Sequence, residues 1–561
     1  MNYKQELSNL LEPLLNIENI YNQIEIPERK MGDFAFPCFR LARELKKAPP
    51  AIASEIAEKI NASLPDWLEK ATPTGPYINF FIKKSKLANT VISQAIVQGE
   101  NFGKSNIGTG KTIVIDYSSP NIAKPFHVGH LRSTVIGQAL YNIYEHLGYN
   151  CIGVNHLGDW GTQFGKLIAA YKMWSSKEEI ETGGIPALNS IYVKFHDQAK
   201  EDPSLEDQGR NYLLKMEQGD EEALSIWSFF NHISLKEFER VYKRLDIKFD
   251  HYTGESFYQD KMQPVLDELD KKGLLQESQG AKIVDLESFD LPPCLVLRAD
   301  GGTLYHTRDL ATAFYRKQTF DFHKVLYVTA IDQSLHFNQL FRVIQKMGYQ
   351  WSDDMHHVPF GLVSLESGKL STRSGNVVLM EDLLNSAVSK ATEIINEKNP
   401  ELADKENVAE AVGIGAIIFN DLYNQRIKDI TFSLEKMLNF DGETGPFVQY
   451  AHARAVSLLK KGGDIDITNI NYSSLTDEES QNLLYHLYFF NEKLIEATEK
   501  LEPYIVTRHV TQTAQAFNKF YQVHKIIDSP QKNERLALVL ATKNMLKTGL
   551  KLIGIAAPDR M

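Results

Sequence analysis

Apolar residues change their spacing several times along the first part of the chain, and each spacing predicts a different element. Ala51–Ile60 carries apolar residues at helical intervals behind two consecutive prolines, which favour the start of a helix. Tyr77–Ile82 is a short apolar run typical of a strand. Gly103–Lys111 is rich in glycine, serine and threonine and is typical of a linker. Residues 1–105 are therefore predicted to form a small α+β domain.

A second pattern begins after this linker and alternates strands with helices. Thr112–Tyr117 and Cys151–Asn155 predict buried strands. Between them lie four apolar residues at helical spacing, in a helix predicted to end near Gly148: Ile136, Leu140, Ile143 and Leu147. A strand, a helix and a strand in this order form a βαβ unit, so a parallel sheet is expected.

The same alternation returns later in the chain. Val325–Thr329 and Val358–Leu365 predict strands, with a helix at Leu335–Met347 between them. The residues between the two sheet halves, about 175–295, are predicted to be a mostly helical insertion. Residues 106–435 are therefore predicted to form a Rossmann-like α/β domain with a doubly wound parallel sheet.

From about Val408 the pattern is almost entirely helical. Two series of mostly apolar residues repeat at intervals of three and four: Leu483, Leu487, Phe490, Leu494 and Ala497, then Ala514, Phe517, Tyr521 and His524. This spacing predicts an all-α bundle over residues 436–561, with the aromatic members in its core.

Composition narrows the class of protein. The chain has 561 residues, 43% hydrophobic and 24% charged, as in a globular protein of several domains. No run approaches the roughly 18 apolar residues of a membrane helix, and the N-terminus shows no signal pattern, so we expect a cytoplasmic protein. Cys38, Cys151 and Cys294 lie far apart without zinc-binding spacing, so no metal site is expected. The net charge of −11 disfavours nucleic-acid binding overall, but the last ~60 residues are locally basic.

The first candidate for chemistry follows the Thr112–Tyr117 strand. A loop from Asp116 leads to His127-Val128-Gly129-His130 at the start of the next helix. Ligands of doubly wound sheets bind at the carboxyl ends of strands and at helix N-termini. The glycine lets the backbone approach a nucleotide, and the imidazoles can donate to phosphate oxygens. Taken alone, two such histidines are more often structural or surface residues.

The second candidate is Lys369-Leu370-Ser371-Thr372-Arg373, which follows the last predicted strand and a turn. A basic loop rich in hydroxyl groups is suited to closing over a polyphosphate. Taken alone, it is equally well a solvated surface turn.

Together, the two segments resemble the HIGH and KMSKS signatures of class I aminoacyl-tRNA synthetases. Further stretches resemble the arginyl-tRNA synthetases in particular, and they span essentially the whole chain: Gly32–Ala35, Gly75–Asn79, Ser118–Arg132, Gly158–Gly161, Tyr305–Ala311, Asp332-Gln333 with His336, Gly442–Arg454 and Ala557–Met561. The resemblance implies ATP-dependent ligation of L-arginine to the 3′-terminal adenosine of tRNA(Arg) through an arginyl-adenylate, with release of AMP and pyrophosphate.

The resemblance also implies which residues act on ATP. Catalytic roles fall to His127, His130, Lys124, Lys369 and Arg373. ATP contacts fall to His127, Gly129, His130, Gly361, Val363, Lys369 and Ser371. Thr372 stands where the second lysine of the signature would be, and Lys124 is expected to supply that charge. ATP implies Mg²⁺, which binds mainly through the substrate phosphates.

Arginine recognition requires oxygen acceptors, because a guanidinium is always charged and carries five donors. The resemblance assigns this role to Asp116, Ser119, Asn121, Tyr305, Asp309 and Gln333. Asp309 could instead cap a helix or pair with Arg308.

The resemblance finally implies contacts with tRNA. The C-terminal bundle is expected to bind the anticodon stem and loop through Tyr450, His452, Arg454 and Met561, and the N-terminal domain to contact the tRNA elbow. A monomer whose arginine activation requires bound tRNA is expected from the family.

Three other functions remain open at this point. A different HxGH nucleotidyltransferase or adenylate-forming ligase is usually shorter and lacks the helical C-terminal region. An inactive paralogue that only binds tRNA would not need His127, His130, Lys369 and Asp309 together. A class I synthetase for another amino acid, such as cysteine, would be expected to carry zinc thiolates near the pocket.

Overall fold

The computed structural model describes residues 2–15, 17, 19–299, 302, 304–365, 368–369, 378–466 and 470–561, and for residues 365, 368 and 369 only the backbone. The chain divides into two compact units. One comprises residues 1–102, 455–489 and 515–545, and the other residues 103–454, 490–514 and 546–561.

The first unit is built around a three-stranded antiparallel sheet in the order β1-β3-β2. Its elements within the first 102 residues are α1 (Tyr3–Leu15), α2 (Ile20–Gln23), β1 (Phe34–Pro37), α3 (Leu41–Leu45), α4 (Pro49–Ala62), β2 (Leu68–Thr74), β3 (Tyr77–Ile82) and α5 (Lys84–Gln98). The strand predicted at 77–82 and the helix predicted at 51–60 are confirmed. Helix α18 (Glu478–Tyr488) packs on α1 and β1: Tyr3 N donates to Tyr488 Oη at 2.8 Å, and the ring centres of Phe34 and Tyr488 lie 6.3 Å apart.

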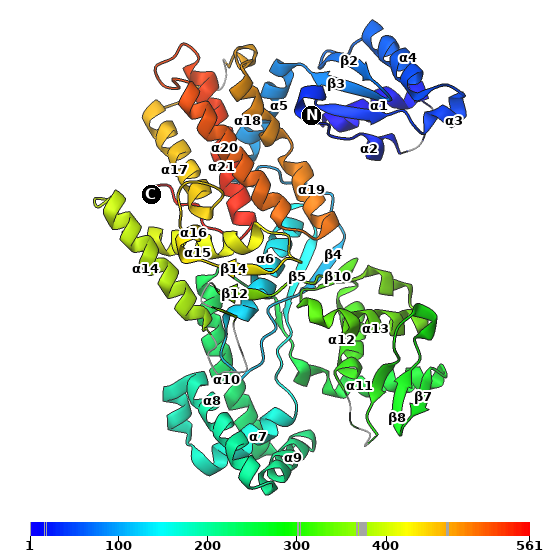
Figure 1. Cartoon of the computed structure of the whole chain (residues 1–561), viewed down its shortest axis with the longest axis vertical. Coiled ribbons are helices and arrows are strands. Elements are labelled where there is room, and N and C mark those ends of the chain that lie inside the picture. The colour runs from blue at the N-terminus through cyan, green and yellow to red at the C-terminus, as the bar shows by residue number, and fades with distance from the viewer. Residues whose placement is uncertain are drawn as a thin grey trace. The chain divides into compact units, whose positions relative to one another are not determined.

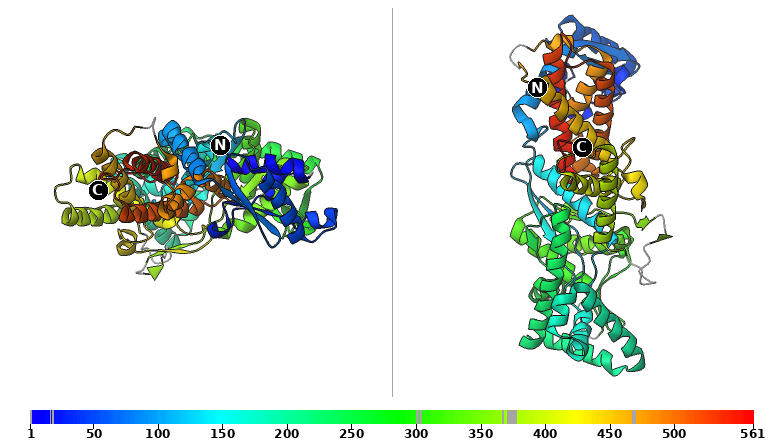
Figure 2. Two further views of the ribbon diagram at one scale, coloured as in Figure 1. Left: turned by 90° about the horizontal axis from the view of Figure 1, so that it is seen from above. Right: turned by 90° about the vertical axis from the view of Figure 1, so that its left-hand side faces the viewer.

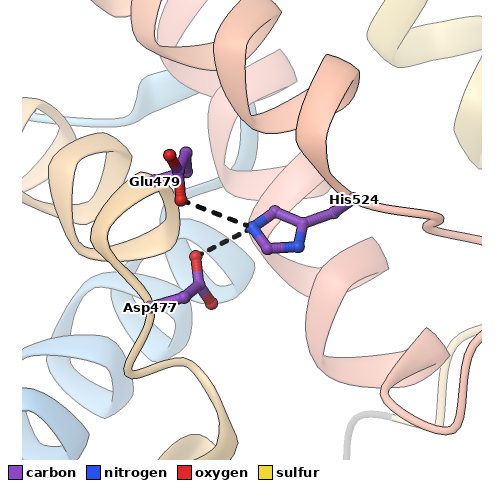
Figure 3. A group of neighbouring side chains, drawn as sticks. All are labelled: Asp477, Glu479 and His524. Carbon is purple, nitrogen blue, oxygen red and sulfur yellow. Dashed lines mark hydrogen bonds and ion pairs between the residues drawn. The ribbon is translucent and has the colours of Figure 1, made fainter.

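One cluster of polar side chains in this unit consists of Asp477, Glu479 and His524 (Figure 3). Asp477 caps α18 by accepting from Ser480 N at 2.8 Å, and His524 Nε2 lies 2.9 Å from the same carboxylate. Burial acts to raise the pKa of Asp477, but its bonds to Ser480 and His524 outweigh that effect and hold the pKa below its ordinary value. Side chains of these types also bind metals, but here a helix cap and an ion pair account for their arrangement.

The second unit contains a five-stranded parallel sheet in the order β11-β10-β4-β5-β6, which confirms the predicted doubly wound α/β fold. The strands are β4 (Thr112–Asp116), β5 (Asn150–Asn155), β6 (His251–Tyr252), β10 (Lys324–Tyr327) and β11 (Met355–His357). Strands β4 and β10 begin the two halves of the sheet and pair side by side. Their carboxyl ends, Asp116 and Tyr327, therefore mark the topological switch point where such sheets bind ligands.

Helices of the second unit cover the sheet and extend beyond it. They include α6 (Leu131–His146), α12 (Tyr305–Phe320), α13 (Ser334–Lys346), α14 (Met380–Lys398) and α15 (Lys405–Leu422). Most residues of α6 are buried, including Ile136, Leu140, Ile143 and Leu147 at its end. The helices predicted around these residues and at 335–347 are confirmed within one or a few residues.

The single strand predicted at Val358–Leu365 is wrong. Strand β11 ends at His357, and β12 (Val363–Leu365) belongs to a separate small sheet with β13 (Gly368–Lys369) and β14 (Ile430–Phe432). Pro359 between them offers no backbone N–H for a sheet ladder. At Gly361, a Cβ would lie 2.7 Å from both Asp429 Oδ1 and Ile427 O, so the chain packs there only without a side chain.

The insertion begins with four helices that pack together (Figure 1): α7 (Thr162–Trp174), α8 (Lys177–Glu201), α9 (Ser204–Glu217) and α10 (Glu221–Arg244). Figure 2 shows the same group of helices from the side. The expectation that residues of about 175–295 are mostly helical is confirmed, but the part after α10 also contains strands, and β6 within it belongs to the main sheet. A 3₁₀ turn η4 (Glu255–Lys261) and α11 (Met262–Lys271) lead to an antiparallel sheet of β7 (Leu275–Ser278), β8 (Ala281–Val284) and β9 (Cys294–Leu297). Gln279 and Gly280 both have positive φ, which suits a tight hairpin.

The C-terminal region is helical as predicted, with α16 (Leu434–Met437), α17 (Gly445–Gly462), α18, α19 (Phe490–Lys500), α20 (Tyr504–Val523) and α21 (Lys532–Leu552). All members of the first apolar series are buried, although α18 ends at Tyr488 and α19 starts anew at Phe490. Phe517 is buried, but Tyr521 is 40% exposed and is not a core residue as expected. No helix in the part of the chain described here has the length and apolarity to cross a membrane.

A buried ion pair ties the segments around the switch point together. Arg132, in the first turn of α6, is fully buried, and its Nε lies 3.3 Å from Asp421 of α15. Its Nη1 donates to the carbonyl oxygens of Gly361 at 2.9 Å and Lys428 at 2.7 Å. One guanidinium therefore joins α6, the segment before β12, the segment before β14, and α15.

Asp421→Asn should lower the free energy of unfolding by about 3–5 kcal/mol, because it leaves the buried Arg132 cation without its counter-charge. Thermal and urea denaturation measure this change. The control Asp207→Asn removes an equivalent carboxylate from an exposed pair with Arg210 and should cost less than about 1 kcal/mol. Equal effects of the two substitutions would show that the buried pair does not stabilise the unit.

Candidate active site

The first signature segment pairs with a stretch of chain that follows the second one. Val128 N donates to Val378 O at 3.1 Å, and Met380 N donates to Phe126 O at 3.0 Å, so the chain just after the Lys369–Arg373 segment pairs with the chain around His127. The backbone of Lys369 lies in β13, antiparallel to β12. Ser371 and Arg373 lie outside the described residues.

His127 and His130 form a compact turn with defined hydrogen bonds. Gly129 N donates to His127 Nδ1 at 3.0 Å, and His127 N donates to His130 Nδ1 at 3.2 Å. The ring centroids are 4.0 Å apart, and the ring of Phe126 stacks on His130. Because both Nδ1 atoms accept from the backbone, a neutral ring carries its proton on Nε2, which can then donate to a ligand.

Burial favours the neutral form of both imidazoles. Burial lowers the pKa of His130 to about 3, with smaller contributions from His127 and Lys124. Burial, followed by the charge of Lys124, also lowers the pKa of His127. Lys124 is exposed, and its positive charge contributes to the lowered pKa of both rings.

The loop between β4 and His127 adopts an unusual backbone. Ser118, Ser119 and Ala123 have φ values of 68°, 48° and 59°, in the left-handed region that non-glycine residues seldom occupy. Asn121 is exposed and forms an isolated bridge with Gly158, where a Cβ would lie 1.8 Å from Asn121 Oδ1. Gly158 therefore has to be glycine for this loop to pack as it does.

Asp116, at the end of β4, is already paired inside the protein. Its Oδ2 lies 2.8 Å from Nη2 of the fully buried Arg316, and its Oδ1 accepts from Ser119 Oγ at 2.8 Å. Burial alone would lower the pKa of Arg316, but the carboxylate of Asp116 raises it above its ordinary value. Both oxygens of Asp116 thus have partners within the protein, and Arg316 neutralises its charge.

Asp309 presents a more open carboxylate. It lies on α12 one turn after Tyr305, so both side chains share a helix face; Asp309 is 26% exposed and Tyr305 67% exposed. His336 Nε2 lies 2.6 Å from Asp309 Oδ2. Burial acts to raise the pKa of Asp309, but the bond from His336 outweighs it, and the pKa lies below its ordinary value. Gln333 is exposed in the turn that leads into α13, the helix of His336.

Gly361 and Val363, which the family resemblance assigned to ATP, lie just before β12 and at its start. The carbonyl of buried Gly361 accepts from Arg132, and its N–H donates to Arg426 O at 2.9 Å. Val363 starts β12 and pairs with Ile430 of β14. The close packing of Ile427–Asp429 against Gly361 accounts for a glycine at this position.

Sequence reasoning missed several charged or titratable residues around the switch point. His156, just after β5, is half-buried, and its Nδ1 has no hydrogen-bond partner among the described atoms. Burial lowers its pKa, and the charges of Asp116, Arg316 and Asp309 all act on it. Position after a strand of the sheet is a signal that could have identified His156. Arg316, in the middle of a helix far along the chain, carried no such signal.

The residues expected to contact tRNA differ in their surroundings. Tyr450 is 40% exposed, and the guanidinium of Arg454 lies 4.8 Å from its ring centre. His452 is fully buried, with Nδ1 3.1 Å from Pro558 O, so the structure does not present its ring to solvent. Met561 O accepts from Asn399 Nδ2 at 3.2 Å, which anchors the chain end.

Comparison with protein families decides the class. A family described as class I tRNA synthetases (R), catalytic domain, matches residues 91–434. The chain belongs to the class I arginyl-tRNA synthetase family. The arginyl-tRNA synthetase N-terminal domain matches residues 1–82, and the DALR anticodon-binding domain matches residues 448–561.

Individual proteins agree with this assignment. The chain is 54% identical to an arginine–tRNA ligase of Alkaliphilus metalliredigens and 52% identical to one of Clostridioides difficile, each over the full length of both chains. Among solved structures, arginyl-tRNA synthetase from Thermus thermophilus superposes with a TM-score of 0.85 at 25% identity, covering both chains completely. That from Plasmodium falciparum superposes at 0.83 and 26%, covering 100% of this chain and 98% of its own.

Glu255 gives this synthetase a testable pH dependence. Its carboxylate lies 2.6 Å from Arg308, yet burial, the largest effect, raises its pKa from an ordinary 4.5 to about 7. A carboxyl group whose pKa is raised on folding stabilises the protein below its unfolded pKa and loses that contribution as the pH rises through the folded pKa. The melting temperature of Glu255→Gln, relative to the parent protein, should therefore increase between about pH 5 and pH 8.

The control for this measurement is Glu268→Gln. Hydrogen bonds from Tyr349 and Lys272 outweigh burial there and hold the pKa of Glu268 below its ordinary value, so its contribution should stay constant over the same pH range. If the difference in melting temperature between Glu255→Gln and the parent protein does not change with pH, the pKa of Glu255 is not raised.

Proposed function

We propose that this synthetase ligates L-arginine to the 3′-terminal adenosine of tRNA(Arg), with ATP as co-substrate. The observation that carries the proposal is the backbone pairing of the first signature segment with Val378–Met380, which follow the second signature segment along the chain. Asp309 lies within electrostatic reach of His156 and Tyr327, at the carboxyl ends of β5 and β10. A polyanion site and a carboxylate for a cationic side chain therefore occur at the same sheet edge.

In the first step, the arginine carboxylate attacks the α-phosphate of ATP, and pyrophosphate leaves with the electrons of the broken bond. His127 and His130 donate through neutral Nε2–H groups, which can hold phosphate oxygens without changing charge during the reaction. Lys124 lies close enough to these rings to add a positive charge at the phosphates. Lys369, Ser371 and Arg373 complete the proposed phosphate site, and Mg²⁺ arrives bound to ATP.

For arginine, we assign the guanidinium to Asp309, with Tyr305 and Gln333 beside it. Asp309 keeps its charge because its pKa is lowered, and it is partly exposed. Asp116 is neutralised by Arg316, so its proposed role is to hold Ser119, with Asn121 close by, for the α-amino and carboxylate groups. Acceptors placed to bind the planar guanidinium of arginine discriminate against lysine, because the lysine ammonium lacks that planar geometry and leaves some of these acceptors unpaired.

In the second step, the 2′-hydroxyl of the terminal adenosine attacks the arginyl-adenylate, and AMP leaves. We propose that residues 436–561 bind the anticodon region, with Tyr450 and Arg454 in contact with RNA. Residues 106–435 form the proposed catalytic domain, and residues 1–105 contact the tRNA elbow. A stacked arginine and tyrosine at the surface suits splayed bases. We also propose that the enzyme acts as a monomer in the cytoplasm.

ATP–pyrophosphate exchange, measured with each proteinogenic amino acid with and without total tRNA, tests this function. We expect exchange with arginine alone, and only when tRNA is present. Exchange with arginine in the absence of tRNA would support arginine as the substrate but would show that activation does not require tRNA. A folded protein that binds tRNA but exchanges with no amino acid would be a tRNA-binding paralogue.

Asp309→Asn should raise the Michaelis constant for arginine by about 100-fold, because the substrate cation loses its charged partner, and should change that for ATP by less than about threefold. Steady-state exchange kinetics with each substrate varied in turn give both constants. Asp321→Asn, which removes an exposed carboxylate at the other end of α12, is the matched control. A parallel rise in both constants would show that Asp309 does not recognise arginine.

A further inference from the structure

Helix α10 of the insertion turns one face toward the loop that carries the active-site residues. Ser234, Phe238 and Tyr242 are spaced four residues apart, so they lie along one side of the helix. All three are buried. Each contacts a different point of the segment Ser118–Phe126, which runs from the end of β4 to His127.

The contacts at both ends of this face are hydrogen bonds. Ser234 Oγ accepts from Ala123 N at 2.9 Å, while its own proton goes to Phe230 O at 2.7 Å. Tyr242 Oη lies 2.8 Å from Ser118 Oγ and accepts from Asn155 Nδ2 at 3.1 Å. The tyrosine proton is thus available to Ser118. On the helix, Phe238 lies between Ser234 and Tyr242, and its ring centre is 5.5 Å from that of Phe126.

These bonds meet the loop at two of its three left-handed backbone positions. Ser118 and Ala123, the two residues that α10 holds by hydrogen bonds, both have left-handed φ values without being glycine. Such conformations persist only where surrounding groups fix them. Ser119 and Asn121 lie between these two points, and Lys124 and His127 follow directly, so the two bonds bracket the proposed substrate-binding residues.

Helix α10 is also fixed at its other contacts. It packs against α8 and α9 of the insertion. Near its C-terminus, Arg240 lies 2.5 Å from Glu381 of α14, and Arg244 lies 2.8 Å from Glu410 of α15. A continuous helix held by the insertion and by α14 and α15 keeps its Ser234–Tyr242 face in a fixed position against the loop.

We propose that Ser234 and Tyr242 are positioning residues for adenylate formation, and that α10 couples the helical insertion to the geometry of the Ser118–Phe126 loop. The inference rests on the proposed function, because the loop is taken to bind arginine and ATP. Neither residue touches the reacting atoms. Their effect acts through the backbone of the loop that presents Ser119, Asn121 and Lys124.

Tyr242→Phe tests this inference by removing one oxygen and keeping the ring. We expect the kcat of arginine-dependent pyrophosphate exchange to fall by about 10- to 100-fold, because a small misplacement of positioning groups has effects of this size. The Michaelis constants for arginine and ATP should change by less than about threefold. Ser234→Ala should act in the same direction and remains informative if Tyr242→Phe fails to fold.

The matched control is Tyr144→Phe. Tyr144 is a buried tyrosine of the same unit whose hydroxyl donates to Thr498 O at 2.9 Å, away from the loop. It should lower the melting temperature to a similar extent and leave kcat unchanged. Combining Tyr242→Phe with Ser118→Ala should give less than the product of the two single effects, because both remove the same bond.

The outcomes separate the two hypotheses. If the parent protein shows no arginine-dependent exchange, the proposed function falls, and this inference falls with it. If the parent protein is active and both Tyr242→Phe and Ser234→Ala keep the kcat of Tyr144→Phe, α10 only packs against the loop and the inference alone is overturned.

Discussion

The arrangement of the segments around the switch point depends on one buried cation. Arg132 has no solvent to stabilise its charge, so Asp421 and the carbonyls of Gly361 and Lys428 must stay in place around it. These partners come from segments far apart in the sequence. The guanidinium therefore fixes the start of α6, just after His130, relative to the segment that leads to the second signature. It also explains the glycine at 361, because a side chain there would push the Ile427–Asp429 backbone away from its present position.

Local sequence pattern predicted the elements whose neighbours are adjacent in the chain. The β-branched run of β4 and the helical spacing of α6 are local properties, and the βαβ unit with its parallel sheet follows from them. The break between β11 and β12 and the hairpin of β7 and β8 escaped prediction. The first depends on packing against Asp429, and the second on backbone conformations at Gln279 and Gly280 that have no strong sequence signal.

The candidate site shows the same difference between local patterns, which could be predicted, and contacts between distant residues, which could not. Motifs located the His127–His130 turn and the α12 face of Tyr305 and Asp309, since each is a short contiguous segment. Pairing between distant residues could not be read from the sequence. Asp116 is engaged by Arg316, a residue about 200 positions away, and His452 is enclosed against Pro558 instead of facing solvent. Both depend on which buried charges and rings meet after folding, and spacing along the chain carries no record of that.

The charged groups near the carboxyl ends of the strands suit ligands of opposite sign. Burial holds the pKa of His130 near 3, so its ring stays uncharged and can donate from Nε2, and the exposed Lys124 adds a positive charge. Asp309 carries a carboxylate whose pKa is lowered by His336, although burial acts to raise it. Arg316 cancels the charge of Asp116, so the more exposed of the two carboxylates, that of Asp309, keeps its charge for a ligand in the proposed function. The proposed division of a polyphosphate and a guanidinium between these groups follows from their charges, because each ligand would meet an unfavourable charge in the position of the other.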